Sequence, residues 1–381
     1  MSWGASKKNI LFISSWYPNR LESTNGNFVQ RHAEAISLLH FVEVLHCIGD
    51  KNQQEKWIID DRKINGIRTL IVYYKKSKYP IINFIRRMKG YKIGFAQLKK
   101  PDLVHANILQ NQSLFAVYLK KKWQIPFVIS EHWSGLLKIN ANKLSLSKKW
   151  LARLVASYSS AVLPVSNNLA KDMKDAGIGK KFFIVENVVD TDIFKPCINE
   201  NKETEKFVFL HISNLVTLKN PEKIINVAAK LRREFSNFEL QIGGDGDIER
   251  LKKEIKKNNA QEYISVFGEI KTNEVATKMQ NADCFLLYSD YENLPCVLLE
   301  SMSCGTPVIA TNVGGISEIV NSNCGELIKV EEKELYTAMK TMLLGNKIYL
   351  SKQEMHQYIV DNFSKLKIAE KIDTVYKNVL V

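Results

Sequence analysis

The feature that most constrains this chain is an alternation of short apolar segments with amphipathic ones, which runs through both halves. In the first half, strands are expected at residues 8–14, 41–47, 102–105, 127–130 and 161–165, with helical patterns at 28–39 and after Ser166. In the second half, strands are expected at 207–212, 238–242, 264–267, 284–288 and 307–310, with helices at 221–235 and 294–304. Such alternation is typical of parallel sheets covered by helices on both faces. The sequence therefore predicts an α/β protein with two doubly wound domains.

The chain length fits this division, because 381 residues correspond to about two domains at roughly 150 residues each. The expected boundary is the segment 187–196, followed by the polar stretch 197–206. We therefore expect an N-terminal domain over 1–188 and a C-terminal domain over 189–363. In open parallel sheets ligands bind beyond the carboxyl ends of the strands. The predicted site is a cleft where two such edges face each other, so its motifs should follow strands.

The charge of the chain is strongly asymmetric. Residues 1–190 contain 30 Lys and Arg against 13 Asp and Glu, whereas residues 191–381 contain 24 against 27. Most of the excess lies in 51–150, with 21 basic and 5 acidic residues. A basic N-terminal half favours an anionic partner, such as phosphate groups or a membrane surface. The basic stretch 81–100 alternates apolar and cationic residues and is interpreted either as an ordinary domain helix or as a membrane-contacting one.

Several classes of protein are excluded at this point. No apolar run approaches the ~18 residues of a membrane-spanning helix, and the N-terminal apolar stretch is broken by Ser14, Ser15 and Pro18, so no cleaved signal peptide is expected. Six cysteines without a Cys-x-x-Cys pair favour reduced thiols in the cytosol. No nucleic-acid recognition motif is found, so no nucleic acid is expected as a partner. No Gly-x-Gly-x-x-Gly follows the first strand, which argues against a dinucleotide-dependent dehydrogenase.

The strongest chemical signal is a pair of glutamates, Glu292 and Glu300, eight positions apart. Glu292 lies in a loop after an expected strand, just before a helix that begins near Pro295, and proline is favoured in the first helical turn. Glu300 lies about two turns further along that helix, so both carboxylates can face one site. A carboxylate accepts hydrogen bonds from sugar or ribose hydroxyls, and the free N–H groups at the helix start favour phosphate.

This stretch, which continues into Gly305-Thr-Pro307, resembles the signature of the retaining glycosyltransferases of family 4, which have the GT-B fold. Their pattern is a glutamate, seven residues, a second glutamate and then Gly-Thr-Pro-Val-Ile. Three further segments resemble the family, so the resemblance covers nearly the whole chain: 187–196, 213–220 and 242–246. It implies that the final segment, 364–381, packs on the N-terminal domain.

The resemblance implies that the C-terminal domain holds a nucleotide-diphosphate-sugar, which is a substrate and not a cofactor. Glu300 would bind the ribose and Glu292 the transferred sugar, and Lys219 would neutralise the departing diphosphate. No metal is expected. The remaining implied donor-binding residues are Asn293 and Leu294 through their backbone N–H groups, Gly244 in the Gly-x-Gly loop, Gly268 and Ile270 in a base-binding loop, and Asn214. Asn214 departs from the family, which usually has arginine at this position.

In the N-terminal half the resemblance points to the loop 130–135, which follows an expected strand. His132 would hydrogen-bond a sugar hydroxyl or a developing oxyanion. Gly26 and Asn27 match the family's first loop, which enters a helix near the diphosphate and the acceptor, and Gly26 permits close backbone approach. His105 also follows a strand, and both a structural and a functional interpretation stay open for it.

The sequence thus predicts a retaining, metal-independent glycosyltransferase that moves a hexose-type sugar from a nucleotide-diphosphate donor to a hydroxyl of a glycan or lipid-linked acceptor. Such a reaction belongs to cell-surface polysaccharide or glycolipid biosynthesis, in the cytoplasm or on the inner face of the cytoplasmic membrane. Two alternatives remain: a nucleotide-sugar 2-epimerase of similar fold, and a non-catalytic glycan- or nucleotide-binding protein. The substitution at Asn214 gives the second alternative some weight.

Overall fold

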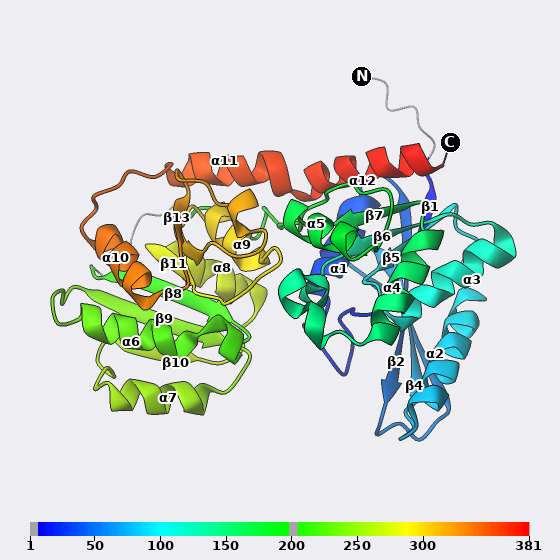
Figure 1. Cartoon of the computed structure of the whole chain (residues 1–381), viewed down its shortest axis with the longest axis horizontal. Helices are drawn as coiled ribbons and strands as arrows, with labels where there is room; N and C mark the ends of the chain where they lie inside the picture. The colour runs from blue at the N-terminus through cyan, green and yellow to red at the C-terminus, as the bar shows by residue number, and fades with distance from the viewer. Residues whose placement is uncertain (1–6, 198–204, 381) are drawn as a thin grey trace. The chain divides into compact units, whose positions relative to one another are not determined.

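The chain folds into two compact units. The structure is a computed structural model that describes residues 7–197 and 205–380. Unit 1 comprises the chain up to Val188 together with the segment from Lys365, and unit 2 comprises Val189–Ser364 (Figure 1). Part of the expected polar boundary stretch, 198–204, lies outside the described residues, as do 1–6 and 381.

Unit 1 is built on a sheet that has seven strands among the described residues, in the order β3-β4-β2-β1-β5-β6-β7. All neighbouring pairs are parallel except β3 with β4. The strands are β1 (Asn9–Ser14), β2 (Phe41–Asp50), β3 (Trp57–Ile64), β4 (Ile67–Lys75), β5 (Leu103–Asn107), β6 (Phe127–Glu131) and β7 (Ala161–Pro164).

The hairpin of β3 and β4 is a feature of unit 1 that the sequence analysis did not predict. The two strands pair antiparallel and are joined by Asn65 and Gly66, which have φ angles of 48° and 83°. An Asn-Gly pair between strands is typical of a two-residue hairpin turn, because both positions need a positive φ. β3 forms the outer edge of the sheet, where most of its side chains are exposed or half-buried.

Helices cover both faces of this sheet, and the C-terminal helix joins the core of the unit. Apolar residues of β1, α1 and α12 form one buried cluster that includes Phe12, Val29, Ala33, Ile372 and Tyr376. The helices of unit 1 are α1 (Asn27–Ser37), α2 (Pro80–Phe95), α3 (Leu114–Trp123), α4 (Leu146–Tyr158), α5 (Asn167–Asp175) and α12 (Lys365–Val379), with short 3-10 turns η1 (Asn111–Ser113), η2 (Ser134–Leu136) and η3 (Lys138–Lys143).

Unit 2 has a six-stranded sheet among its described residues, in the order β10-β9-β8-β11-β12-β13, and every neighbouring pair is parallel. Its strands are β8 (Phe207–Ser213), β9 (Phe238–Gly244), β10 (Ile264–Phe267), β11 (Cys284–Leu287), β12 (Val308–Thr311) and β13 (Gly325–Ile328). Its helices and 3-10 turns are η4 (Thr217–Lys219), α6 (Pro221–Leu231), α7 (Ile248–Lys257), α8 (Thr272–Asn281), α9 (Cys296–Ser303), η5 (Ile316–Glu318), α10 (Glu332–Leu343) and α11 (Lys352–Phe363).

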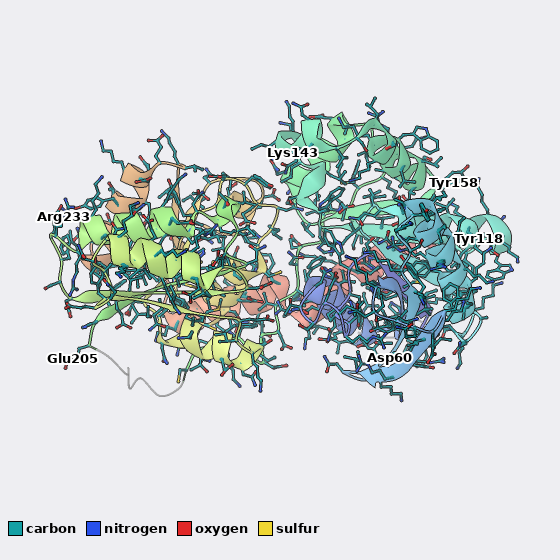
Figure 2. The ribbon with its side chains drawn as sticks, turned by 90° about the horizontal axis from the view of Figure 1, so that it is seen from below. Asp60, Tyr118, Lys143, Tyr158, Glu205 and Arg233 are labelled. Atoms are coloured by element: carbon teal, nitrogen blue, oxygen red, sulfur yellow. The ribbon has the colours of Figure 1, made fainter. Side chains whose placement is uncertain are left out.

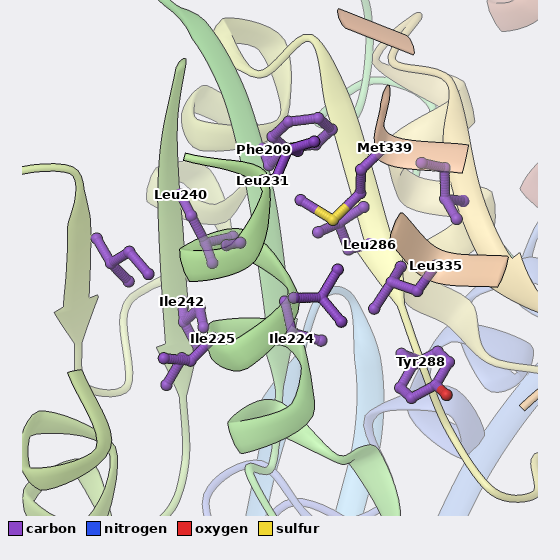
Figure 3. Close-up of a cluster of buried hydrophobic side chains, with 14 of the residues drawn as sticks. Phe209, Ile224, Ile225, Leu231, Leu240, Ile242, Leu286, Tyr288, Leu335 and Met339 are labelled. Carbon is purple, nitrogen blue, oxygen red and sulfur yellow. The ribbon is translucent and has the colours of Figure 1, made fainter. Parts of the chain in front are cut away.

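The core of unit 2 is formed by alternate side chains of the strands and by the apolar face of each covering helix. On β9, Leu240 and Ile242 are two positions apart and point to the same face of the sheet, where they meet Ile224 and Leu231 of α6 (Figure 3). Met339 of α10 joins this cluster from the neighbouring helix. The apolar stripe of each helix is thus buried against one face of the sheet, which fixes the strand ends that carry the polar loops.

In both sheets the order in which successive strands are added reverses at a central strand. In unit 1, β1 lies between β2 and β5, and in unit 2, β8 lies between β9 and β11. At such a point the loops that follow neighbouring strands diverge to opposite faces and leave space at the carboxyl edge of the sheet. Functional side chains are therefore expected after β1, β5 and β6 in unit 1, and after β8, β9, β11 and β12 in unit 2.

Candidate functional site

In unit 2, the loops after β8 and β11 bring Lys219 and Glu292 together. The Lys219 ammonium group forms an ion pair with Glu292 Oε1, and the Ser289 hydroxyl donates a hydrogen bond of 2.7 Å to the same oxygen. Both charged side chains are largely buried, with 15% and 10% of their surface exposed. A buried charge needs a partner, so each of these two groups stabilises the other. The predicted pair of a cation and a sugar-binding carboxylate thus lies in one place.

Neighbouring hydrogen bonds hold these two loops in position. Asn220 Nδ2 donates to the backbone oxygen of Tyr288 at 3.2 Å and to Asp290 Oδ1 at 2.7 Å, and the Asp290 N–H donates to Leu218 O at 3.0 Å. The Thr311 hydroxyl, at the end of β12, donates to Ser289 O at 2.7 Å. The geometry of the ion pair is therefore set by contacts between three strand ends and does not depend on one flexible loop.

Glycines allow the backbone to approach closely around this pair. Gly244 ends β9 with a φ of 128°, and a Cβ atom there would overlap the carbonyl oxygen of Ser213. Gly314 has a φ of 59°, and a Cβ atom there would overlap the carbonyl oxygen of Glu292. Only glycine tolerates both the positive φ and the lack of space. The predicted residue Gly244 is thus required by the packing of the loop after β9 on the loop after β8.

The second glutamate lies on α9, as expected, although that helix begins later than predicted. Pro295 is the residue before the helix, which starts at Cys296 and not at 294. Glu300 is in the middle of α9 and is 5% exposed. Asn293 is also buried, and its carbonyl oxygen accepts a 2.9 Å hydrogen bond from the Gly315 N–H. Asn293 and Leu294 therefore precede the N-terminus of α9, where helix N–H groups favour an anion.

Asn214 follows β8 with an exposed side chain. Beside it, Arg250 of α7 donates a 2.7 Å hydrogen bond to the carbonyl oxygen of Leu215 and pairs with Glu222 at 2.7 Å. Arg250 is a cation near the position where family members usually have arginine, and sequence reasoning missed it. Its link to Leu215, which has a φ of 51°, shows that it braces the loop after β8.

The remaining predicted donor residues lie further along the sheet. Gly268 and Ile270 follow β10, the edge strand, which is separated from β8 by β9. A Cβ atom at Gly268 would meet no atom within 4 Å, so its backbone does not require glycine. The structure therefore groups Lys219 and Glu292 tightly, and it places Gly268 and Ile270 two strands away from β8.

In unit 1, His132 follows β6 and packs against the first turn of α1. Its ring centroid lies 4.5 Å from that of Phe28 and 5.1 Å from that of His32. His132 Nδ1 lies 3.0 Å from Asn187 Oδ1. An amide oxygen can only accept, so Nδ1 carries the proton and Nε2 carries the lone pair. Burial lowers the pKa of His132 well below its usual value, and the neighbouring His32 lowers it further.

The contact with Phe28 brings His132 close to the other two predicted residues of unit 1. Gly26 precedes α1 with a φ of 82°, and a Cβ atom there would overlap the backbone of Trp16, so the position requires glycine. Asn27 is the first residue of α1 and is exposed. The loop after β1 thus lies directly on the start of α1, beside the imidazole.

A buried carboxylate organises the loop that carries His132. Glu131 Oε1 accepts hydrogen bonds from the N–H groups of His132 (2.9 Å) and Trp133 (2.7 Å), and Oε2 accepts one from Leu109 (2.7 Å). Burial raises the pKa of Glu131 to about 7, although the three backbone donors lower it. Sequence reasoning missed this residue. The one available signal was a glutamate at the end of a short strand that begins with three apolar residues, 127–129.

The loop after β5 also carries backbone strain near Glu131. Ile108 has a φ of 69°, which is an outlier for a β-branched side chain. Its N–H donates to Ser130 O at 2.8 Å, and its carbonyl accepts from the Ser113 hydroxyl at 2.7 Å. Strain of this kind persists where surrounding contacts impose it, commonly at functional sites.

For His105, the structure favours the structural interpretation. Its side chain is fully buried on β5, with Nδ1 at 2.6 Å from the Tyr376 hydroxyl of α12 and Nε2 at 2.7 Å from the Ser130 hydroxyl. Burial lowers its pKa to about 3. Both ring nitrogens are thus engaged inside unit 1, where they join the C-terminal helix to the sheet.

Comparisons with known proteins agree with this architecture. Residues 26–193 match the family described as Glycosyltransferase Family 4, and residues 198–362 match Glycosyl transferases group 1. The N-acetyl-alpha-D-glucosaminyl L-malate synthase of Bacillus anthracis is 25% identical over 327 residues, which cover 81% of this chain and 82% of that protein. The UDP-Gal:alpha-D-GlcNAc-diphosphoundecaprenol alpha-1,3-galactosyltransferase of Escherichia coli is 24% identical over 321 residues, covering 79% and 82%.

Solved structures show the same fold. The Anabaena protein Alr3699/HepE, solved in complex with UDP and glucose, superposes with a TM-score of 0.75 at 17% identity and covers 97% of this chain and 100% of its own. Two Rossmann-like units with parallel sheets are typical of GT-B glycosyltransferases, which confirms the predicted fold class. The chain therefore belongs to glycosyltransferase family 4, a retaining family with the GT-B fold, and is an enzyme that transfers a sugar from a nucleotide-sugar donor.

Proposed function

We propose that this enzyme moves a hexose from a nucleotide-diphosphate-sugar to a hydroxyl of a glycan or lipid-linked acceptor, in cell-surface polysaccharide or glycolipid biosynthesis. The observation that carries the proposal is the ion pair of Lys219 and Glu292 beside the switch point of unit 2. A nucleotide-diphosphate-sugar offers both charges a new partner: the diphosphate for the ammonium group and the sugar hydroxyls for the carboxylate.

In this proposal unit 2 holds the donor. Glu292 accepts hydrogen bonds from the transferred sugar and Glu300 from the ribose, while the backbone N–H groups of Asn293 and Leu294 bind the diphosphate or the sugar. Lys219 stabilises the negative charge that develops on the departing diphosphate. Gly244, Asn214, Gly268 and Ile270 contribute the loops around the nucleotide, and Arg250 keeps the loop of Asn214 in place.

Unit 1 holds the acceptor side. In the tautomer set by Asn187, Nε2 of neutral His132 accepts a hydrogen bond from a sugar hydroxyl, and Gly26 and Asn27 present the start of α1 to the diphosphate or the acceptor. The acceptor oxygen attacks the anomeric carbon from the side that the diphosphate leaves, and the acceptor proton passes to the departing phosphate oxygen. This front-side attack retains the anomeric configuration.

We further propose that the enzyme works in the cytoplasm, at the inner face of the cytoplasmic membrane. Within the ranges 7–197 and 205–380, no helix is both long and apolar enough to cross a membrane. The excess of basic residues in 51–150 favours peripheral contact with anionic lipid. The Escherichia coli relative is named for an undecaprenol-linked acceptor, which supports a lipid-linked acceptor here.

The proposal is tested by incubating the enzyme with a panel of nucleotide-sugars and following the products by mass spectrometry. We expect slow release of free nucleotide from the preferred donor, and faster release with a sugar product when a suitable acceptor is added. An epimerised nucleotide-sugar without free nucleotide would contradict transfer and support a 2-epimerase. Binding of a donor without turnover for any acceptor tested would support a non-catalytic binding protein.

A further inference from the structure

Three large apolar side chains are exposed on the segment that follows His132. They are Ile139 on η3 and Leu146 and Trp150 on α4, with exposed fractions of 63%, 84% and 63%. We call the surface formed by η3 and the exposed face of α4 the η3–α4 surface. Lys143 and Tyr158, labelled in Figure 2, mark the ends of η3 and α4. Single exposed apolar residues are common, but three large ones within twelve positions of the chain, two of them on one face of α4, call for a partner.

The orientation of these side chains is fixed by the fold. Leu146 and Trp150 are four positions apart and share one face of α4, whereas Ala152, Val155 and Ala156 pack inside the unit on the opposite face. η3 is anchored on both sides of Ile139: the Lys138 N–H donates to Asp172 Oδ2 at 2.8 Å, and Asn140 Nδ2 donates to Ser134 O at 2.9 Å. Because the neighbouring backbone is held, these apolar groups project from an ordered surface.

The same segment is cationic. The sequence contains no Asp or Glu between Glu131 and Asp172, and in that interval it has six basic residues: Lys138, Lys143, Lys148, Lys149, Arg153 and Lys171. Lys138, Lys143 and Lys148 are exposed beside the apolar trio. A surface that combines Leu, Ile and Trp with several lysines is typical of elements that lie in the interface of an anionic bilayer.

The stretch 81–100, which the sequence analysis singled out, offers a weaker surface. On α2, Ile81 and Ile85 are exposed, but the two arginines that follow them are bound within unit 1. Arg86 donates to Lys75 O, and Arg87 donates to the Tyr74 hydroxyl at 3.2 Å. Lys89, Lys92, Lys99 and Lys100 of this stretch are exposed, so it is cationic as well. It nevertheless presents two large exposed apolar side chains, against three on the η3–α4 surface. The η3–α4 surface also follows the loop of His132 closely in the chain, since η3 starts at Lys138, six residues after His132.

We propose that the η3–α4 surface docks unit 1 on an anionic phospholipid bilayer, with Ile139, Leu146 and Trp150 in the interface and the lysines at the headgroups. This inference rests on the proposed transfer to a lipid-linked acceptor. Docking through η3 and α4 keeps the loop of His132 next to the membrane, so the sugar of an acceptor anchored in that bilayer reaches the imidazole without leaving the lipid surface.

The test is co-sedimentation of the full chain with vesicles of phosphatidylcholine, alone or with about 30% phosphatidylglycerol, at low and high salt. We expect binding to the anionic vesicles at low salt, at least tenfold weaker binding to neutral vesicles, and weakening by salt. The double variant L146S/W150S should bind anionic vesicles at least about tenfold more weakly, because two apolar anchors are lost. The conservative variant L146M/W150F should bind like the wild type.

The matched control is L344S/I348S, which removes two exposed apolar side chains at the same spacing from unit 2. It should bind vesicles like the wild type. All variants should retain the thermal unfolding temperature and the donor hydrolysis rate, since none of these side chains is placed in the donor site. Weakening of threefold or more by L146S/W150S alone supports the inference, and anything smaller overturns it.

Three further outcomes are decisive, and the first two separate this inference from the proposed function. If the wild type ignores anionic vesicles at low salt but transfers sugar to a water-soluble acceptor analogue, the docking inference is wrong and the proposed function stands. If vesicles bind but no acceptor receives sugar, the proposed function fails instead. In the last outcome, the wild type is a dimer that binds no vesicles, and L146S/W150S is a monomer. The η3–α4 surface is then a contact between copies, and the inference is overturned.

Discussion

The carboxyl edges of the two sheets have the same topology but carry opposite kinds of polar chemistry. Unit 2 presents a buried ion pair, Lys219 with Glu292, whose charges compensate each other. Unit 1 presents a neutral imidazole, His132, above a carboxyl group whose oxygens accept backbone N–H groups. Charged partners suit a diphosphate-sugar, and a neutral hydrogen-bonding ring suits a hydroxyl. We therefore expect one kind of scaffold to support two roles, because the loops after its parallel strands differ.

The two units also differ in what they bury and expose. Four of the five buried histidines with lowered pKa values lie in unit 1; they are His32, His46, His105 and His132, and the fifth is His211 in unit 2. Unit 1 contains 34 Lys and Arg against 14 Asp and Glu, whereas unit 2 contains 20 against 26. We therefore expect unit 1 to favour an anionic surface and to be sensitive to acid, whereas unit 2 is net negative. The following variants test this contrast, from the largest expected effect to the smallest.

The largest effect is expected for Glu292→Gln. The amide cannot compensate the Lys219 ammonium group or accept as strongly from sugar hydroxyls, so kcat/KM for transfer should fall by about 10²–10³-fold. The matched control is Glu326→Gln, because Glu326 also accepts from a lysine (Lys347, 2.6 Å) and a hydroxyl (Tyr349, 2.8 Å) in unit 2. Equal rates for both variants in a steady-state transfer assay would contradict the role of Glu292.

His132→Ala should lower kcat for transfer by about 10²-fold, because a group that hydrogen-bonds the acceptor sugar is removed. Since unit 1 is assigned to the acceptor side, the KM for the donor should change little. His132→Gln, which keeps an acceptor atom, should recover part of the rate. A tenfold rise in donor KM with unchanged kcat would show that His132 acts only in donor binding. The assignment of unit 1 to the acceptor and unit 2 to the donor would then be wrong.

Gly244→Ala should raise the donor KM by about tenfold. The new methyl group overlaps Ser213 O, so the loops after β8 and β9 must separate and the nucleotide site is distorted. Gly268→Ala serves as the steric control, since its Cβ meets nothing within 4 Å, and its thermal stability should equal that of the wild type. If Gly244→Ala binds the donor normally in calorimetry, the loop after β9 lies outside the donor site.

Glu131→Gln should reduce the unfolding free energy of unit 1 by about 1–3 kcal/mol. The NH2 group of glutamine replaces one accepting oxygen and leaves at least one backbone N–H without its acceptor. Hydrogen exchange should become faster at Leu109, His132 and Trp133, which donate to Glu131 in the wild type. Transfer should slow by a few-fold through the displaced His132. Unchanged exchange at these amides would show that the carboxylate does not position the loop.

The smallest expected effect per residue is the loss of folding stability that each buried histidine causes when the pH falls. A buried histidine whose folded pKa lies below its unfolded value of about 6.5 contributes stability that is present above pH 6.5 and lost as the pH falls toward the folded pKa. The pKa is about 4 for His46 and about 3 for His105. Between pH 7 and pH 6, each of them should lower the unfolding free energy by less than about 1 kcal/mol. Glu131 opposes this, since its pKa of about 7 is raised and its protonation favours the folded state.

Because unit 1 holds four such histidines and unit 2 one, acid should open unit 1 first. Hydrogen exchange measured by mass spectrometry at pH 7 and pH 6, corrected for the intrinsic exchange rate, resolves the two units. Equal loss of protection in both units would show that the buried histidines do not set their acid sensitivity.

The sequence predicted the features that depend on residues close together in the chain. Strand positions followed from apolar runs, and Lys219, Glu292 and His132 lie after strands, as their motifs indicated, while their roles stay predictions. The start of α9 was misplaced by two residues because proline at 295 caps the helix and does not enter it. The hairpin of β3 and β4 was missed although Asn65-Gly66 was a readable turn signal.

Other features depend on contacts between distant segments and could not be predicted. Glu131 is a positioning group only because Leu109, from a different loop, donates to it. The structural role of His105 depends on Tyr376, which lies 271 residues later in the chain. The brace from Arg250 to Leu215 O likewise joins α7 to the loop after β8. A pattern within one segment contains no information about such partners.

Whether unit 2 holds the donor is tested most directly by hydrogen-exchange footprinting of the full chain with UDP, and then with the nucleotide-sugar selected by turnover. We predict protection at 214–220, 243–247 and 288–300, and none of comparable size in unit 1 without acceptor. Protection confined to unit 1, or its absence from 288–300 at saturating donor, would contradict the assignment of the Lys219 and Glu292 pair to the nucleotide-sugar.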